Sequence, residues 1–364
     1  MRKIRLLATF VCAIVLSACG ENRPTNAPGG MSTQIEEETP AEEAEDPLEA
    51  PETDEVPDEA DTEVAWDGFH IRFVTIEEGC ELLLSNGPFF ENMTQNDIEY
   101  RMQKKGATLE EYKRFAGEQV REFTDSEKTV IEEHVRVLEE ICMEKGYILP
   151  YIEEISFVKT TMEEEGGAAA YTHGTQIYLS DWLLEFLKSM DEETALYGTS
   201  TIAHELFHCL TRCSPSFRAQ MYGVLGFTVE EEDFVFSEEI QKMIVSNPDV
   251  EHLNAHAAFR INGEDKECVV VYALKRDFEK AGDDLFDVSR ICLVPVDTLS
   301  VLYEADEAEN FYEVFGRNTG YVIDPEEALA DNFSYALIYG LDGKEYENPE
   351  IIEKIIALLR RDDL

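Results

Sequence analysis

Two histidines four positions apart, His204 and His208, flank a glutamate at position 205 within residues 199–210. On an α-helix such histidines lie on the same face, so both imidazoles can reach one metal ion while Glu205 stands beside them. Neutral imidazole is a good zinc ligand, and a zinc ion lowers the pKa of bound water to about 7. Glu205 can then take the proton of this water as it attacks a carbonyl carbon, and later deliver it to the leaving amine. The spacing therefore predicts metal-assisted hydrolysis.

A catalytic zinc site needs a third protein ligand, and the downstream candidate is Glu327. Asp324 can act as an N-cap and Pro325 fits the first helical position, which predicts a helix with Glu327 and Asp331 on one face. Glu327 can then ligate the metal while Asp331 orients one histidine. The spacing of Asp324 and Glu327 also fits a capping box, but a capping box gives no reason for Asp331. The pattern favours the metal site.

The segment His204-Glu205-Leu206-Phe207-His208, followed by Glu327-Ala328-Leu329-Ala330-Asp331, resembles the gluzincins, the thermolysin-like class of zinc metallopeptidases. The resemblance implies that His204, His208 and Glu327 bind one Zn²⁺ ion. It also implies that Glu205 is the general base and that Asp331 orients a histidine. Residues 210–212 and 317–327 resemble a group of bacterial lipoproteins regarded as zinc peptidases, a match that covers roughly residues 150–340. Thermolysin has far fewer residues than the 118 that lie here between His208 and Glu327.

The oxyanion that develops during hydrolysis also needs a hydrogen-bond donor. Tyr321, six residues before Glu327, occupies a place similar to that of a tyrosine used by gluzincins. A core tyrosine in a strand is the alternative, and His256 and Tyr222 remain open as donors. His252 and His256 have the spacing of a second ligand pair, but no glutamate motif accompanies them. We therefore expect them to serve structure or substrate contact before metal binding.

Helices must position these residues, and the spacing of apolar side chains predicts where the helices lie. The two histidines fall in a helix within residues 194–212. Threonine-led capping boxes open two earlier helices over roughly 108–123 and 125–145, and His134 beside the apolar stripe of the second is expected to be structural and partly exposed. Further helices are predicted over 181–190, 216–225 and 349–361.

Strand patterns surround the metal helix on both sides in the sequence. Residues 155–158 show the alternation of apolar and polar side chains that is typical of a strand, and residues 168–172 and 176–179 are expected to form a hairpin. In zincins an edge strand just upstream of the metal helix pairs with the extended substrate, and the resemblance makes residues 168–180 the candidate for that role, with an ordinary hairpin as an equal alternative. Strands near 254–262, 268–274 and 291–301 predict a small antiparallel sheet between the zinc helices, inserted at about 226–310. The expected fold class is α+β and zincin-like, with a mixed or antiparallel sheet.

The N-terminus has the pattern of a targeting segment. Basic residues precede an apolar run at 6–16, which is typical of a secretory signal. The following Leu16-Ser17-Ala18-Cys19 resembles a bacterial lipoprotein signal, which implies cleavage after residue 18 and a lipid on the Cys19 thiol. Plain secretion is the weaker alternative. Residues 19–65 are acidic and rich in proline, which predicts a disordered tether. An acidic partner-binding or calcium-binding tail is the alternative.

The formal net charge of −48 argues against nucleic-acid binding, because phosphate contacts need lysine and arginine. It would favour cationic substrates by long-range steering, although a solvated acidic surface is the commoner meaning. After removal of the signal and modification of Cys19, an even number of cysteines remains, which fits disulfides in an extracytoplasmic protein. They are Cys80, Cys142, Cys209, Cys213, Cys268 and Cys292.

The sequence thus predicts a signal peptide (1–18), a lipid-anchored linker (19–65), a helical N-terminal region (66–150) and a catalytic domain (151–364). We expect a monomeric zinc metallopeptidase that acts on peptides or proteins outside the cytoplasm. A lipid would hold it on a membrane of the bacterial envelope, the outer membrane in a Gram-negative cell. Two alternatives stay open: a zinc-binding but inactive surface lipoprotein, and a non-enzymatic adhesion or scaffold lipoprotein with structural histidines.

Overall fold

The computed structural model describes residues 68–189, 195–283 and 285–361. The predicted signal peptide (1–18), the lipid-attachment residue Cys19 and the linker (19–65) lie outside these residues. The described residues belong to one compact unit, so residue 150 does not separate two units. None of the helices within these ranges has both the length and the apolar character needed to span a bilayer.

Apart from α3, which begins at Asn86, the helices of the N-terminal region begin at threonine caps. In α2, α4, α5 and α6, a threonine hydroxyl accepts the amide of an acidic residue three positions on, whose carboxylate bonds back. The prediction for 125–145 is confirmed by α6, but α5 ends at Gly117 because residues 120–121 form a strand. The helices are α2 (Ile76–Ser85), α3 (Gly87–Asn92), α4 (Gln95–Met102), α5 (Leu109–Gly117), α6 (Asp125–Lys145), α7 (Asp181–Ser189), α8 (Ala195–Cys213), α9 (Pro215–Val224), α10 (Glu238–Gln241), α11 (Leu285–Val288), α12 (Phe311–Phe315), α13 (Pro325–Ile338) and α14 (Pro349–Arg360).

The first sheet is mixed and has the strand order β1-β3-β5-β4, with β2 paired to β3. The strands β1, β3 and β5 are parallel, whereas β4 runs antiparallel to β5 at one edge. The predicted hairpin is therefore confirmed, and its first strand is an edge strand. The bounds are β1 (Ile71–Phe73), β2 (Val120–Arg121), β3 (Ile155–Thr160), β4 (Ala170–His173) and β5 (Gln176–Ser180).

The second sheet is antiparallel and lies in sequence between α8 and α13, which confirms the predicted insertion. Its order is β10-β9-β8-β7-β6, and each strand pairs antiparallel with its neighbour. Asn262 and Gly263 both have positive φ angles, 56° and 77°, as a two-residue hairpin between β7 and β8 requires. The bounds are β6 (Thr228–Val229), β7 (Ala255–Ile261), β8 (Glu264–Leu274), β9 (Ser289–Pro295) and β10 (Tyr303–Glu304). The observed class is α+β.

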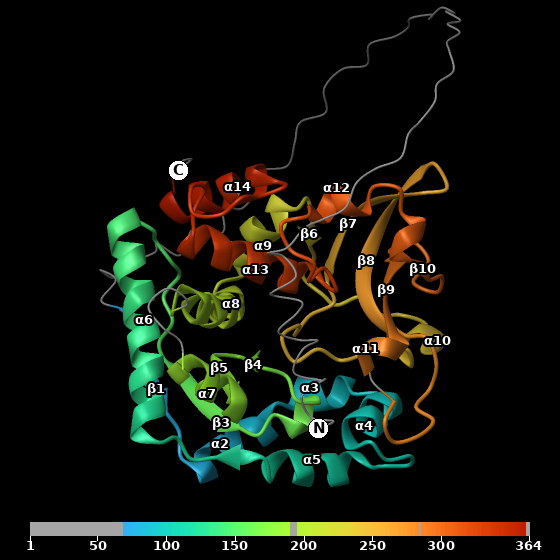
Figure 1. The fold of residues 1–364 in the computed structure, drawn as a ribbon. Coiled ribbons are helices and arrows are strands. Elements are labelled where there is room, and N and C mark those ends of the chain that lie inside the picture. The colour runs from blue at the N-terminus through green and yellow to red at the C-terminus, as the bar shows by residue number, and fades with distance from the viewer. Residues whose placement is uncertain (1–67, 190–194, 284, 362–364) are drawn as a thin grey trace, which may run out of the picture. The chain divides into compact units, whose positions relative to one another are not determined.

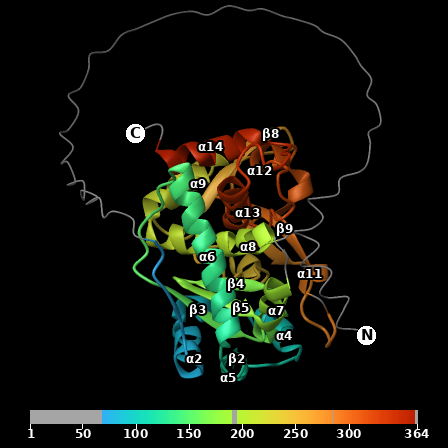
Figure 2. The ribbon, with the colours of Figure 1, turned by 60° about the vertical axis from the view of Figure 1, so that its left-hand side comes forward.

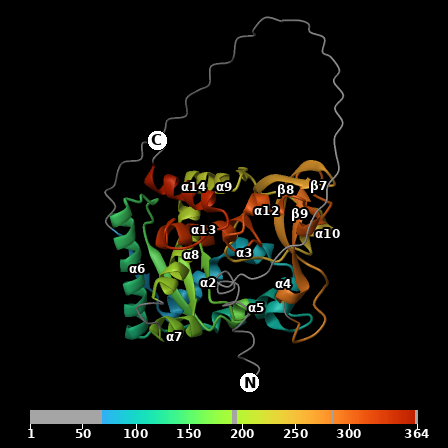
Figure 3. The ribbon, with the colours of Figure 1, turned by 45° about the horizontal axis from the view of Figure 1, so that its top comes forward.

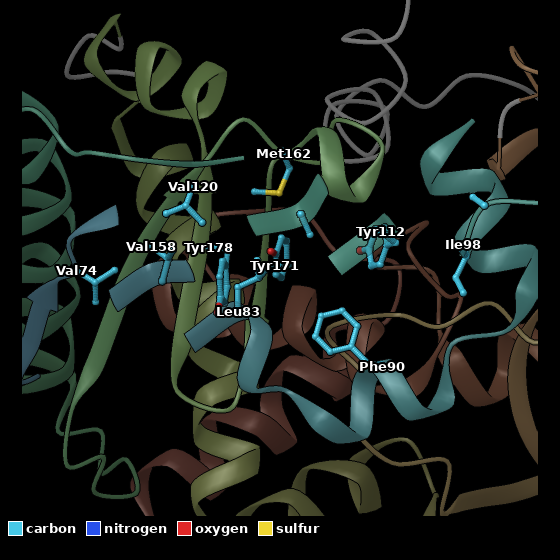
Figure 4. Packing of buried hydrophobic residues seen from close by; sticks show 12 residues of the cluster. Val74, Leu83, Phe90, Ile98, Tyr112, Val120, Val158, Met162, Tyr171 and Tyr178 are labelled. Carbon is cyan, nitrogen blue, oxygen red and sulfur yellow. The ribbon is translucent and has the colours of Figure 1, made fainter. Parts of the chain in front are cut away.

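Helices α2 to α5 pack their apolar side chains against the first sheet (Figure 4). Val158 on β3 and the stacked rings of Tyr171 and Tyr178 on β4 and β5 meet Leu83 and Tyr112 from the helices. On the same sheet, α7 contacts β5 and α8 contacts β4 and β5. This burial holds the edge strand β4 in a fixed position beside α8.

Helix α6 runs past α8 and packs closely against it (Figure 2). Gly198 allows this approach, because a Cβ atom there would lie 2.9 Å from the His134 ring. His134 is 8% exposed, and its Nδ1 lies 2.9 Å from the Thr199 hydroxyl. The expectation of a partly exposed His134 is therefore wrong, since the ring is enclosed between two helices.

The six cysteines of the described residues are free thiols, which corrects the expectation of disulfides. On the second sheet, Cys268 faces Pro295 and Cys292 faces Val271, so the strand register keeps the two cysteines apart. Cys209 is buried, whereas Cys213 on the same helix is exposed.

A buried acid near the first sheet gives a stability prediction. Burial raises the pKa of Glu164 to about 7, whereas an unfolded glutamate has a pKa of about 4.3. Protonation of Glu164 therefore favours the folded state, and this stabilisation is lost as the pH rises through about 7. Glutamine cannot ionise, so we compare the free energy of unfolding of Glu164→Gln with that of the wild type at two pH values. The difference should be roughly 1–3 kcal/mol more favourable to the variant at pH 8 than at pH 5. Thermal unfolding at both pH values measures this.

Glu163→Gln is the matched control, because Glu163 is the exposed neighbour of Glu164. It should change the stability equally at the two pH values. An equal effect of Glu164→Gln at both would show that Glu164 does not titrate between them.

Candidate metal centre

Helix α8 carries the two histidines on one face with Glu205 beside them, as the spacing predicts. Its other faces are buried through Ile202, Leu206 and Phe207, which fix the rotation of the helix. Helix α13 lies directly against α8, and the two helices are neighbours in all three ribbon views (Figures 1, 2 and 3). The ring centroids of Phe207 and Phe333 lie 5.3 Å apart across this contact. Packing therefore sets the distance between the side chains of the two helices.

The start of α13 is fixed by its cap. The Asp324 carboxylate accepts the amide of Glu326 at 2.7 Å, and Pro325 occupies the first turn. Asp324 is thus the predicted N-cap, but its carboxylate caps without a reciprocal bond from Glu327. Glu327 instead points towards α8, which removes the capping box as an explanation for this residue.

His204, His208 and Glu327 come together in three dimensions. One ligand atom from each lies within 4.8 Å of the other two. The Nε2 atom of His204 is 3.2 Å from Glu327 Oε2, and the Nε2 atom of His208 is 3.7 Å from the same oxygen. Two imidazole nitrogens and one carboxylate oxygen therefore converge on one point.

Each histidine is held from behind by a carboxylate of α13. Nδ1 of His204 lies 2.9 Å from Asp331, and Nδ1 of His208 lies 3.2 Å from Glu326. A proton on each Nδ1 would satisfy these carboxylates, and the Nε2 atom of each ring faces Glu327. Asp331 also accepts the Thr319 hydroxyl. Both rings are therefore oriented for ligation.

The donor set fits a zinc ion. Nε2 of His208 is buried and makes no hydrogen bond within the described part of the chain, although such an atom normally has a partner. Burial opposes ionisation of Glu327, but the hydrogen bond with His204 and the nearby His208 ring lower its pKa below the ordinary value. Two neutral imidazoles with one carboxylate are a known ligand set of catalytic zinc. The orphaned nitrogen and the ionised carboxylate both suit a cation at this point.

Glu205 stands beside this cluster, against the first sheet. Its Oε2 accepts the hydroxyl of Thr172 on the edge strand β4 at 2.8 Å. The side chain is buried, and this burial raises the pKa of Glu205 although both histidines lower it. A carboxylate of raised pKa is a stronger base, so the position suits proton transfer.

The remaining predicted residues lie at different distances from the cluster. Tyr321 is beside it, because its hydroxyl donates to Glu327 Oε1 at 3.1 Å. Tyr222 donates to Glu326 at 2.6 Å, behind His208. His252 lies against Asp233 and His256 between Glu230 and Glu267, so they do not form a ligand pair. Of the three donors considered, only Tyr321 contacts a residue of the converging set.

Sequence reasoning missed four residues of the site. Glu326 orients His208, Thr172 holds Glu205, and two side chains enter from the insertion. These are Asn247, whose Nδ2 donates to Glu327 Oε1 at 2.6 Å, and Asp249, which groups with Glu205 and His208. The Glu326-Glu327 pair was a usable signal, whereas nothing in the sequence connects residues 247–249 with the zinc helices.

Comparison of the chain with protein-family models, curated proteins and solved structures finds no match. The converging side chains of α8 and α13 are therefore the observations that bear on function.

Proposed function

We propose that this protein is a zinc metallopeptidase of the gluzincin class, with a zincin-like catalytic fold. One observation carries the proposal: the Nε2 atoms of two carboxylate-oriented histidines converge with Glu327 while a buried Glu205 stands beside them. His204, His208 and Glu327 would hold one Zn²⁺ ion per chain. The ion would supply Lewis acidity, polarising the substrate carbonyl and making a water molecule acidic near neutral pH.

The protein's own groups would move the proton. Glu205 accepts it from the attacking water and passes it to the leaving nitrogen of the peptide. The Thr172 hydroxyl holds the Glu205 carboxylate in place for both transfers. Tyr321 is our candidate donor to the developing oxyanion, which it would reach by turning its hydroxyl away from Glu327.

The substrate class follows from the edge strand. β4 has one side paired to β5 and lies against α8, beside Glu205. An extended peptide that added to the other side of β4 would place its backbone next to the zinc ligands. We therefore propose peptides or proteins as substrates, read mainly through their main chain.

The location remains a proposal from the N-terminal sequence. The pattern around Cys19 supports a lipid anchor, and the acidic residues 19–65 would hold the enzyme away from the membrane. We propose a monomer that works outside the cytoplasm in a bacterial envelope, on the outer membrane in a Gram-negative cell.

A zinc-binding but inactive protein is the second candidate, and one observation favours it. Asn247 and Asp249 enter the cluster from the insertion, where a catalytic site keeps a position open. Zinc analysis of the purified chain, combined with hydrolysis of a peptide library, separates the candidates. One zinc per chain with cleavage supports the peptidase, and zinc without cleavage in any variant supports the second candidate. Absence of zinc after loading would exclude both.

Glu326 gives a sharper test of how the site is built. We expect Glu326→Gln to weaken zinc binding by about 10- to 100-fold, because His208 loses the charged partner of its Nδ1. Competition with a chromophoric chelator measures the affinity. Glu353→Gln, which neutralises an exposed acid on α14, is the control and should leave it unchanged. Equal affinities for the two variants would refute this role of Glu326.

A further inference from the structure

One short segment of the insertion lies along the free edge of β4. The backbone amide of Thr172 donates to Asp249 Oδ1 at 2.6 Å, and the amide of Gly174 donates to Glu251 Oε1 at 2.9 Å. The Thr172 amide thus points away from β5, towards the side on which another strand could add. Two carboxylates of the insertion therefore satisfy the backbone groups that an incoming peptide would need.

The same segment reaches the converging ligands. Asn247 Nδ2 donates to Glu327 at 2.6 Å, and the Asp249 carboxylate lies within 4.8 Å of ligand atoms of both Glu205 and His208. Asp249 is 8% exposed, so it fills this space and excludes solvent from it. Residues 247–251 thus take both the edge of the strand and the space next to the general base.

Internal bonds make the segment a defined turn. The amide of Asp249 donates to the Asn247 side chain at 3.0 Å, and the amide of Val250 donates to the Asn247 carbonyl at 3.1 Å. Arg212 on α8 clamps its far side, with Nη2 donating to the Pro248 carbonyl at 3.3 Å and Nε 3.0 Å from Glu251. These contacts hold the two entering side chains in one arrangement.

Ser246, just before the turn, is tied to the N-terminal helices. Its amide donates to Asp97 at 3.1 Å, and its carbonyl accepts Arg101 Nη2 at 2.6 Å. Both partners lie on α4, which carries no residue of the converging set. The position of the turn thus depends on a part of the fold outside the two zinc helices.

Electrostatics make the closed arrangement costly without a cation. Asp249, Glu205 and Glu327 bring three buried carboxylates close together, and like charges in such a place repel. The two histidines and Arg212 offset part of this repulsion, and the turn also uses Arg212 to hold Glu251 and Pro248. A divalent cation at the histidines would offset the repulsion and retain Asp249.

We propose that residues 247–251 are a built-in plug that closes the site against substrate, with Asp249 beside the general base and Asp249 and Glu251 on the edge of β4. Substrate would bind only after this turn moves out. The turn forms one wall of a cavity of about 380 Å³, together with residues such as Arg212 and Tyr222, so displacement would widen an existing space. The inference rests on the proposed peptidase function and adds its regulation.

The test compares the full-length wild type with Asp249→Ala after zinc loading. If the plug closes about 90% of molecules, its removal should tighten the apparent affinity for a peptide hydroxamate by about tenfold, measured by calorimetry. Hydrogen exchange at the Thr172 amide should rise in parallel, because this amide loses its acceptor. The exchange is an independent readout that needs no turnover.

Glu231→Gln is the matched control, because it removes an exposed acid near the same cavity without touching β4. It should leave hydroxamate affinity and Thr172 exchange as in the wild type. Asp249→Asn is the second variant if Asp249→Ala fails to fold, since its amide oxygen can still accept the Thr172 amide. It should tighten hydroxamate binding and raise Thr172 exchange together, because the neutral amide loses the attraction of the bound cation and the turn opens more often.

The outcomes are distinguishable. Tighter hydroxamate binding in the Asp249 variants than in Glu231→Gln supports the plug. Zinc-loaded wild type and Asp249 variants that bind the hydroxamate equally would overturn the plug and leave the proposed function standing. Absence of zinc and of hydroxamate binding from every variant would overturn the proposed function, and the plug with it.

Discussion

Replacing Glu205 with glutamine should lower kcat for peptide hydrolysis by about 10²- to 10⁴-fold, the usual contribution of a general base. Glutamine keeps the size of the side chain and an oxygen that can accept the Thr172 hydroxyl, so the fold should persist. It lacks the basicity needed to take a proton from water. Zinc content should stay at one ion per chain, because Glu205 is not among the three converging ligands.

Initial rates with a fluorogenic peptide, beside elemental analysis of the same samples, measure both quantities. Should the plug make wild-type turnover too slow to follow, the comparison is made in the Asp249→Ala background. Thr172→Val is an informative companion, because it removes the hydroxyl that holds Glu205 and leaves the base itself. Turnover of Glu205→Gln at the parental rate would refute the assignment of the base.

Glu327→Ala should abolish the stabilisation of the protein by zinc. At a zinc concentration of about 100 times the dissociation constant, binding adds about 2.7 kcal/mol to the wild type's free energy of unfolding. Glu327 supplies the carboxylate that faces both Nε2 atoms, so its removal should weaken binding by more than the roughly 10- to 100-fold expected for a ligand's partner. Calorimetric unfolding with and without zinc measures the difference.

Glu327→Gln accompanies this experiment, because its oxygen can still accept from Asn247 and Tyr321 while the charge is lost. It separates the loss of the ligand charge from any disturbance of the packing of α13. The exposed Glu353→Ala on α14 should respond to zinc as the wild type does. A full zinc-dependent increase in stability in both Glu327 variants would exclude Glu327 as a ligand.

The local parts of the site could be predicted from the sequence. The four-residue spacing of His204 and His208 fixes their common face as soon as the segment is helical. Asp324 and Pro325 similarly mark the start of α13 and place Glu327 and Asp331 on one face of it. In both helices, neighbours in the sequence determine the geometry. The edge position of β4 was instead expected from the resemblance to zincins, in which an edge strand precedes the metal helix.

The parts that depend on tertiary contacts could not be predicted. Glu326 and Glu327 are about 100° apart around a helix, and only the packing of α13 on α8 decides which of them faces the ligand side. His134 was expected to be partly exposed because α6 alone leaves it beside the apolar stripe, but Gly198 lets α8 cover it. Asp249 enters the site from a turn whose sequence resembles that of any surface turn.

The cysteines failed as predictors for a similar reason. An even number in an exported chain indicates disulfides only if pairs come within bonding distance, and the strand register separates Cys268 from Cys292. Burial of four of the six shows that they act as small apolar residues in this fold.

The three side chains of the proposed zinc site and both carboxylates that orient the histidines belong to α8 and α13, two helices that pack directly on each other. The second sheet and the turn at 247–251 lie between these helices in the chain and supply none of these five side chains, although Asn247 of the turn donates to Glu327. The intervening region could therefore be lengthened, shortened or rebuilt without removing the proposed ligands. Variants of this chain could change what reaches the proposed metal centre while the two helices keep its ligands together.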